Sequence, residues 1–161
     1  MTTTEQVSTA PVADTDGVNP TRETSVSTLE LMPSGILLWQ YKRDSVVTMT
    51  EAQEEADTIQ ALFDAAHWDG RCWLLIDISK MRSIDRASRR FFASEEVHTN
   101  FGVQGLALVM GSPIGTMIGN IYHAINKTVH PTRLFTTQEK AAAWLSGLIK
   151  TSDAGASEGS L

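Results

Sequence analysis

The sequence predicts an α/β fold in which a mixed five-stranded sheet carries about four helices, in the order β-β-α-β-α-β-α-β-α. Residues 73–78 form an apolar run that only Asp77 interrupts, which is typical of a strand covered on both faces. Short apolar runs alternate along the chain with segments of helical periodicity, and this alternation indicates right-handed crossovers with helices packed on a sheet. Residues 28–31 alternate at period two before a turn, which predicts a hairpin at the start of the fold.

Turn and edge signals place the five strands. Pro33 and Gly35 supply the turn of the hairpin, because proline fixes one φ and glycine accepts a positive one. Pro131 lacks a backbone donor, so the last strand should lie near an edge of the sheet. The expected strands are residues 28–31, 36–41, 73–78, 105–110 and 131–135.

Capping residues mark where helices begin. Thr48 with Glu51, and Thr136 with Glu139, match the spacing of a capping box, and Asp85 is suited to cap a helix between them. The expected helices start near residues 48–50 and end before residue 68, then cover about 85–98, about 113–125 and about 136–149. Four carboxylates near the start of the first helix favour its dipole, and we interpret them as a solvated face rather than a metal site. They are Glu51, Glu54, Glu55 and Asp57.

The composition is that of one globular domain between two polar tails. The chain has 161 residues, of which 42% are hydrophobic and 20% charged, and its formal net charge of -6 argues against nucleic-acid binding. Residues 1–25 and 151–161 lack apolar periodicity, so we expect disordered tails around a domain of residues 26–150. We find neither a secretory signal nor an apolar run of the roughly 20 residues that span a bilayer, which favours a cytoplasmic protein.

No residue pattern points to catalysis, a metal or a cofactor. The single cysteine, Cys72, is predicted to be a small core residue. No two histidines stand four apart with a supporting carboxylate, so we expect no zinc site and no enzyme activity. The segment 111–115 lacks the Gly-Lys-Ser/Thr ending of a phosphate-binding loop. Asp77 needs hydrogen-bond donors inside its strand, and we expect backbone amides of the following loop to supply them.

Three local signatures occur in order along residues 28–149. They are residues 75–78 running into Ser83-Ile84-Asp85, then residues 107–115, then residues 131–135 before a capped helix that contains Ala143-Trp144-Leu145. Together they resemble the STAS-like superfamily, in particular the small bacterial SpoIIAA-like (STAS/SEC14-type) domains. The resemblance implies a non-enzymatic regulatory module that binds a partner protein.

The resemblance also implies a phosphoswitch that this sequence lacks. In STAS domains of anti-sigma antagonists, a serine directly after an Asp at the start of the second helix is phosphorylated by the partner kinase. Here Arg86 follows Asp85, so that serine is missing, and neither Ser83 nor Ser88 occupies its position. We expect the location to remain a docking surface, now strongly basic, for an acidic or phosphorylated partner. The candidate partner- or anion-binding residues are Arg82, Ser83, Asp85, Arg86, Ser88, Arg89 and Arg90.

Two alternatives stay open. The four arginines suit a docking contact, but they also suit a solvated face paired with Glu95 and Glu96. A small-molecule or lipid-binding domain of SEC14-like type is the alternative function, favoured by the aliphatic and methionine residues around Met110, and it requires an internal pocket. Gly115 and Gly119 permit close approach of another element, either the sheet or a second copy in a homodimer.

Overall fold

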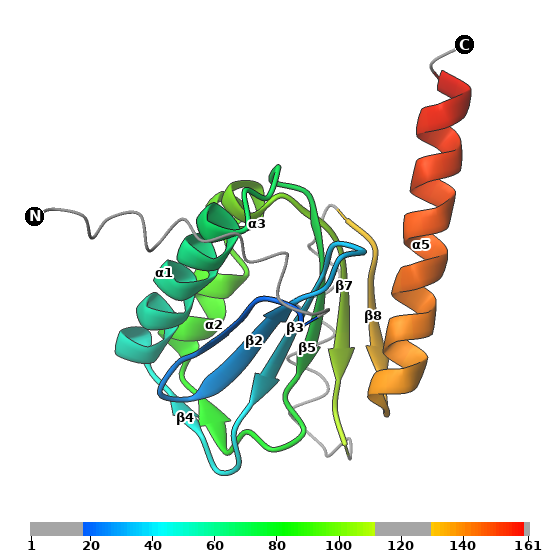
Figure 1. Cartoon of the computed structure of the whole chain (residues 1–161). Helices are drawn as coiled ribbons and strands as arrows, with labels where there is room; N and C mark the ends of the chain where they lie inside the picture. The colour runs from blue at the N-terminus through cyan, green and yellow to red at the C-terminus, as the bar shows by residue number, and fades with distance from the viewer. Residues whose placement is uncertain (1–17, 112–129, 160–161) are drawn as a thin grey trace, which may run out of the picture.

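The computed structural model describes residues 18–111 and 130–159, which form a six-stranded mixed sheet and four helices (Figure 1). The strands lie in the order β1-β2-β3-β5-β7-β8; neighbouring strands are antiparallel from β1 to β3 and parallel from β3 to β8. The sheet contains β1 (Thr21–Glu23), β2 (Ser27–Leu31), β3 (Ile36–Tyr41), β5 (Cys72–Asp77), β7 (Val103–Val109) and β8 (Thr132–Phe135). A separate parallel pair joins β4 (Val46–Val47) to β6 (Ser83–Ile84). The helices are α1 (Met49–Ala65), α2 (Arg86–Phe92), α3 (Glu95–Phe101) and α5 (Gln138–Gly159).

Helices cover both faces of the sheet. Helices α1, α2 and α3 pack on one face and α5 lies on the other (Figure 1). Because side chains alternate along each strand, β5 sends Leu74 into the first core and Leu75 into the second. Both cores are therefore continuous across the central strands, as the apolar run at residues 73–78 predicted. No helix in the described ranges is long and apolar enough to cross a membrane.

The hairpin and the start of the first helix are confirmed. Strands β2 and β3 pair antiparallel around Gly35, which has a φ of 96°. A β-carbon at Gly35 would lie 3.1 Å from the Trp68 ring, so the turn requires glycine both for its φ and for space. Thr48 caps α1, and the Glu51 carboxylate accepts a hydrogen bond from the Thr48 backbone N–H at 2.8 Å. Cys72 is buried in the core, as expected.

The sheet has six strands rather than the expected five. The additional strand β1 lies inside residues 1–25, which we had expected to be disordered. It pairs with the outer edge of β2, and the Leu31 N–H donates to the carbonyl of Pro20 at 2.9 Å. All three residues of β1 are exposed, so backbone pairing rather than apolar burial holds the strand.

The expected helix at about residues 85–98 is wrong, because two short helices replace it. Helix α2 ends at Phe92 and α3 begins at Glu95, with Ser94 as the N-cap. The Ser94 hydroxyl accepts from the Val97 N–H at 3.3 Å and donates to the Phe91 carbonyl at 2.7 Å. A serine that satisfies one donor and one acceptor in this way stops one helix and starts the next.

The last helix also differs from its expected bounds. Its cap is Thr137 rather than Thr136, since the Thr137 hydroxyl accepts from the Lys140 N–H at 3.3 Å. Helix α5 continues to Gly159, past the expected end near residue 149 and into the range that we had expected to be disordered. An established helix gains one hydrogen bond for each residue added, which favours such an extension. The expected helix at 113–125 lies outside the described residues, as do Gly115 and Gly119.

Candidate functional site

The predicted docking residues lie on a loop and helix that are fixed by backbone pairing. The N–H groups of Arg82 and Ser83 donate to the carbonyl of Ser45, at 2.8 and 3.2 Å, and the Asp85 N–H donates to the carbonyl of Val47 at 3.0 Å. These bonds continue the short β4–β6 pair. They hold the segment before α2 against the loop that follows β3.

Asp85 is the N-cap of α2, as predicted. Its carboxylate accepts a hydrogen bond from the Ser88 backbone N–H at 2.8 Å. Hydrogen bonding from Ser88 and the positive charge of Arg89 hold the pKa of Asp85 below its ordinary value. Asp85 is thus an ionised capping group that positions the helix. The Ser88 side chain is buried and its hydroxyl makes no hydrogen bond to the described residues, so it is not available on the surface.

Four arginines form what we call the arginine surface: Arg82, Arg86, Arg89 and Arg90. All four side chains are exposed. The Arg89 guanidinium donates to the carbonyl of Ile84 at 2.7 Å, which fixes its position. Within residues 18–111 and 130–159 the structure contains one ion pair, between Lys42 and Glu23, and none that involves these arginines. The alternative pairing with Glu95 and Glu96 is therefore not formed; both carboxylates belong to α3, beyond the break at Ser94.

Glu55 is a notable site that the sequence reasoning missed. Its side chain is fully buried, which contradicts our interpretation of the four carboxylates as a solvated face. Its carboxylate accepts hydrogen bonds from the Ser27 hydroxyl at 2.6 Å, the Trp39 indole N–H at 2.8 Å and the Tyr41 hydroxyl at 2.9 Å. Burial raises the pKa of Glu55, while the three donors oppose that shift. Burial raises the pKa of the Tyr41 hydroxyl, and the negative charge of Glu55 raises it further.

Asp77 ends β5 and joins two distant parts of the chain. The Ser79 N–H donates to Asp77 Oδ1 at 2.9 Å, which confirms the expected loop amide. The Gln138 side-chain amide donates to Asp77 Oδ2 at 2.7 Å and to Gln40 Oε1 at 2.8 Å. Burial alone would raise the pKa of Asp77, but these hydrogen bonds and the charge of Lys80 outweigh it and lower the pKa. Asp77 is therefore an ionised group at the end of β5 that contacts the first residue of α5.

A crevice of about 370 Å³ opens above Asp77 at the carboxyl ends of β3 and β5. Its walls come from β2, β3 and β5, the loops that follow β3 and β5, and the first residue of α5. Polar and charged side chains dominate its lining, and three of them are cations. The crevice is lined by Thr28, Gln40, Tyr41, Lys42, Arg43, Asp77, Lys80 and Gln138.

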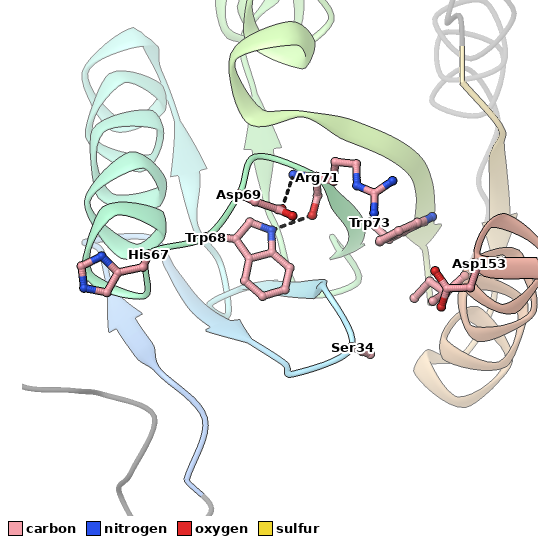
Figure 2. A pocket seen from close by; sticks show the side chains of 8 residues that line it. Ser34, His67, Trp68, Asp69, Arg71, Trp73 and Asp153 are labelled. Atoms are coloured by element: carbon pink, nitrogen blue, oxygen red, sulfur yellow. Dashed lines mark hydrogen bonds between the residues drawn. The ribbon is translucent and has the colours of Figure 1, made fainter. Parts of the chain in front are cut away.

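A second hollow of about 310 Å³ lies near the amino end of β5, beside the late turns of α5 (Figure 2). The Trp68 indole N–H donates to the carbonyl of Arg71 at 2.6 Å, and the Arg71 N–H donates to the Asp69 carboxylate at 3.2 Å. These bonds fold the segment between α1 and β5 into a compact turn. The Trp73 side chain is almost fully buried, so the hollow offers little of that ring to a ligand.

Two histidines pair outside these hollows. The rings of His98 and His130 stack with centroids 4.8 Å apart, and Nδ1 of His98 lies 2.6 Å from Nε2 of His130. These two nitrogens hydrogen bond to each other, with donor and acceptor set by the tautomers. In the part of the chain that the structure describes, no group of three or more histidine, cysteine or acidic residues is placed to hold a metal ion.

Comparison with known proteins now places the chain in a family. A family model described as a domain of unknown function, DUF7793, matches residues 30–149. The chain belongs to this family. No curated protein matches it by sequence.

Two solved structures share the fold of this DUF7793 domain. One is an uncharacterized DUF3478-family protein with a SpoIIAA-like fold from Shewanella loihica PV-4; it has a TM-score of 0.52 and 12% identity, with 80% of this chain and 92% of that chain covered. The other is the anti-sigma factor antagonist SpoIIAA in its unphosphorylated form, with a TM-score of 0.51, 14% identity, and 75% and 98% covered. The SpoIIAA-like fold that the three sequence signatures predicted is therefore confirmed.

Proposed function

We propose that this DUF7793 chain is a non-enzymatic regulatory module that binds an acidic partner protein through the arginine surface. The observation that carries the proposal is the set of four exposed arginines at residues 82–90 that make no ion pair with the described residues. A guanidinium presents its donors in a planar fork that matches a carboxylate, so such a cluster suits an acidic segment.

The charge of the whole chain supports a local contact. The formal net charge is -6, so the arginine surface is a positive region on an acidic molecule. Complementary potentials steer association and suppress wrong orientations more than they add affinity. An acidic partner would therefore approach in one orientation, with its carboxylates toward α2.

The backbone around the arginine surface supports a preformed contact. Arg82 is held by its N–H bond to Ser45, and Arg89 by its bond to Ile84. A surface that is already ordered loses less conformational entropy on binding. The likeness in fold to an anti-sigma factor antagonist supports a regulatory role. In STAS domains of such antagonists a serine follows the Asp at the start of the second helix, whereas here Arg86 follows Asp85.

Charge reversal tests this proposal. Three full-length proteins are compared: the wild type, an Arg86→Glu/Arg90→Glu variant and a matched Arg22→Glu/Lys150→Glu control. The wild type captures partners from an extract of the native cells, and the captured partner is identified. Its affinity for each of the three proteins is then measured. We expect the arginine-surface variant to bind the captured partner at least about tenfold more weakly than the wild type and the control. Its thermal midpoint should be unchanged, since both side chains are exposed. Equal binding by all three proteins would refute the role of this surface.

The SEC14-like alternative gains no support from the described hollows. A lipid chain requires a cavity lined mainly by apolar side chains. The crevice above Asp77 is lined mainly by charged and amide groups, and the lining of the second hollow includes the charged residues Asp69, Arg71 and Asp153. Neither hollow offers the surroundings that an acyl chain needs.

A further inference from the structure

We propose that the crevice above Asp77 binds a small sugar phosphate. Its phosphate would lie against Lys42, Arg43 and Lys80, and its hydroxyl groups would lie on the side chains of Asp77 and Gln40. This ligand site is separate from the docking function proposed above and does not depend on it.

The position of the crevice is the first argument. In open α/β sheets, ligands bind outside the carboxyl ends of the parallel strands, and the crevice lies where β3 and β5 end. Its volume of about 370 Å³ is within the range of small-molecule sites. The second hollow, by contrast, lies at the amino end of β5. Helix α5 begins at the crevice with Gln138, so its dipole adds to the positive field there.

The three cations are the second argument. They come from the loops after β3 and β5, and the Asp44 N–H joins these loops by donating to the carbonyl of Lys80 at 2.8 Å. Lys42 is partly engaged, since its ammonium contacts Glu23 at 2.6 Å and the carbonyl of Thr24 at 2.9 Å. Arg43 and Lys80 make no ion pair with the described residues. Their charges are thus available to a phosphate dianion.

The polar floor is the third argument, and it distinguishes a sugar phosphate from a bare anion. Gln138 and the Ser79 N–H each donate to one oxygen of Asp77, and a carboxylate has about four acceptor sites, so Asp77 can still accept from a ligand hydroxyl. The Gln40 side-chain N–H₂ donates to none of the described residues, so it offers a donor beside this acceptor. The hydroxyl groups of a sugar both donate and accept hydrogen bonds, so they fit the Asp77 carboxylate and the Gln40 amide together. The Asp77 carboxylate repels a phosphate, so it directs the phosphate toward the cations.

Titration of the full-length protein with defined probes tests the proposal. Ribose 5-phosphate, ribose and inorganic phosphate would each be added while amide NMR shifts are recorded. We expect ribose 5-phosphate to bind with a Kd of about 1 mM or tighter and to shift the Ser79 amide and the side-chain amides of Gln40 and Gln138. Ribose and inorganic phosphate should each bind at least about fivefold more weakly, because each lacks half of the contacts. Absence of shifts at these three residues would overturn the proposal.

Variants separate the two halves of the site. Arg43→Gln/Lys80→Gln should weaken ribose 5-phosphate about tenfold, while the matched control Arg22→Gln/Lys150→Gln should not. Asp77→Asn should weaken ribose 5-phosphate but leave inorganic phosphate binding equal or stronger, a selective loss that unfolding cannot produce. If Asp77→Asn leaves ribose 5-phosphate unaffected, or if inorganic phosphate binds as tightly, the site takes a bare anion and the proposal fails.

A further variant keeps this proposal distinct from the docking function. Arg86→Glu/Arg90→Glu leaves every side chain of the crevice in place. It should therefore bind ribose 5-phosphate with wild-type affinity even where partner capture is lost. Loss of both activities in this variant would contradict the separation of the two sites.

Discussion

Glu55 ties α1 to two strands through one buried carboxylate. It accepts from Ser27 in β2 and from Trp39 and Tyr41 in β3. The Ser27 hydroxyl also lies 2.8 Å from that of Thr24, so the network reaches the chain just after β1. A carboxylate can accept from all of these donors at once, which is why an acidic residue is tolerated inside this core.

Glu55→Gln should destabilise the fold by about 1–3 kcal/mol, because the amide N–H₂ would meet a donor and leave it unsatisfied. Urea unfolding measures the change. Glu54→Gln is the matched control: Glu54 is half-buried and accepts from the N–H and the hydroxyl of Ser25 in solvent-exposed hydrogen bonds, so this change should cost less than about 1 kcal/mol. Equal effects from the two variants would show that the buried network does not stabilise the fold.

Some site residues were predictable from the sequence and others were not. Glu55 lies between Ala52 and Ile59 on the buried stripe of α1, so its helical spacing predicts burial. The acidic residues beside it in the sequence favoured a solvated face instead. The Ser79 amide beside Asp77 was predictable because it is two residues away. Gln138 was not, since only the folded sheet brings it to Asp77.

At the scale of elements, two glycines should respond to alanine in opposite directions. Gly35→Ala places a side chain at a φ of 96° and 3.1 Å from Trp68, so it should cost about 1 kcal/mol or more. Gly147 is inside α5 and a β-carbon there meets no atom within 4 Å, so Gly147→Ala should stabilise by about 0.5–1 kcal/mol. Thermal unfolding of both variants checks the signs. Stabilisation by Gly35→Ala would contradict the role of the hairpin turn.

Elements held by local chemistry were the ones that the sequence predicted. The hairpin at Gly35 and the Thr48 cap follow from residues close together in the chain. Strand β1 escaped prediction because its exposed residues carry no apolar period and its hydrogen bonds depend on the free edge of β2. The break at Ser94 escaped because a serine inside a periodic segment is compatible with one helix or two.

At the scale of the whole molecule, the two proposed sites share supporting loops. The loop after β3 carries Lys42 and Arg43, and the loop after β5 carries Lys80 and Arg82. Backbone bonds from Asp44 to Lys80 and from Arg82 to Ser45 join them. One pair of parallel strands thus delivers cations both to the crevice and to the arginine surface. This arrangement follows from the strand order, in which β3 and β5 are neighbours although α1 separates them in the chain.

Carboxylates with shifted pKa values should make stability rise with pH below about 4.5, and Glu55 should oppose that rise above it. The pKa values of Glu51, Asp77 and Asp85 are lowered from ordinary values of 4.5, 3.8 and 3.8, so the unfolded chain binds more protons in acid and stability rises with pH up to that range. The lowered pKa of His130 adds stability in the same way as pH rises to its ordinary value of 6.5. The pKa of Glu55 is raised from 4.5, so above this pH the folded protein retains the extra proton, and Glu55 lowers stability until it ionises.

Glu55→Gln removes this second contribution. The difference in stability between wild type and Glu55→Gln should therefore be greatest near or below pH 4.5 and should shrink as pH rises through the folded pKa of Glu55. Urea unfolding of both proteins from about pH 3 to about pH 8 measures it, a range that spans the ordinary carboxyl values. The rising acid limb should remain in the variant, because Glu51, Asp77 and Asp85 are unchanged. A constant difference across the range would show that Glu55 is ionised at the same pH in the folded and unfolded chain.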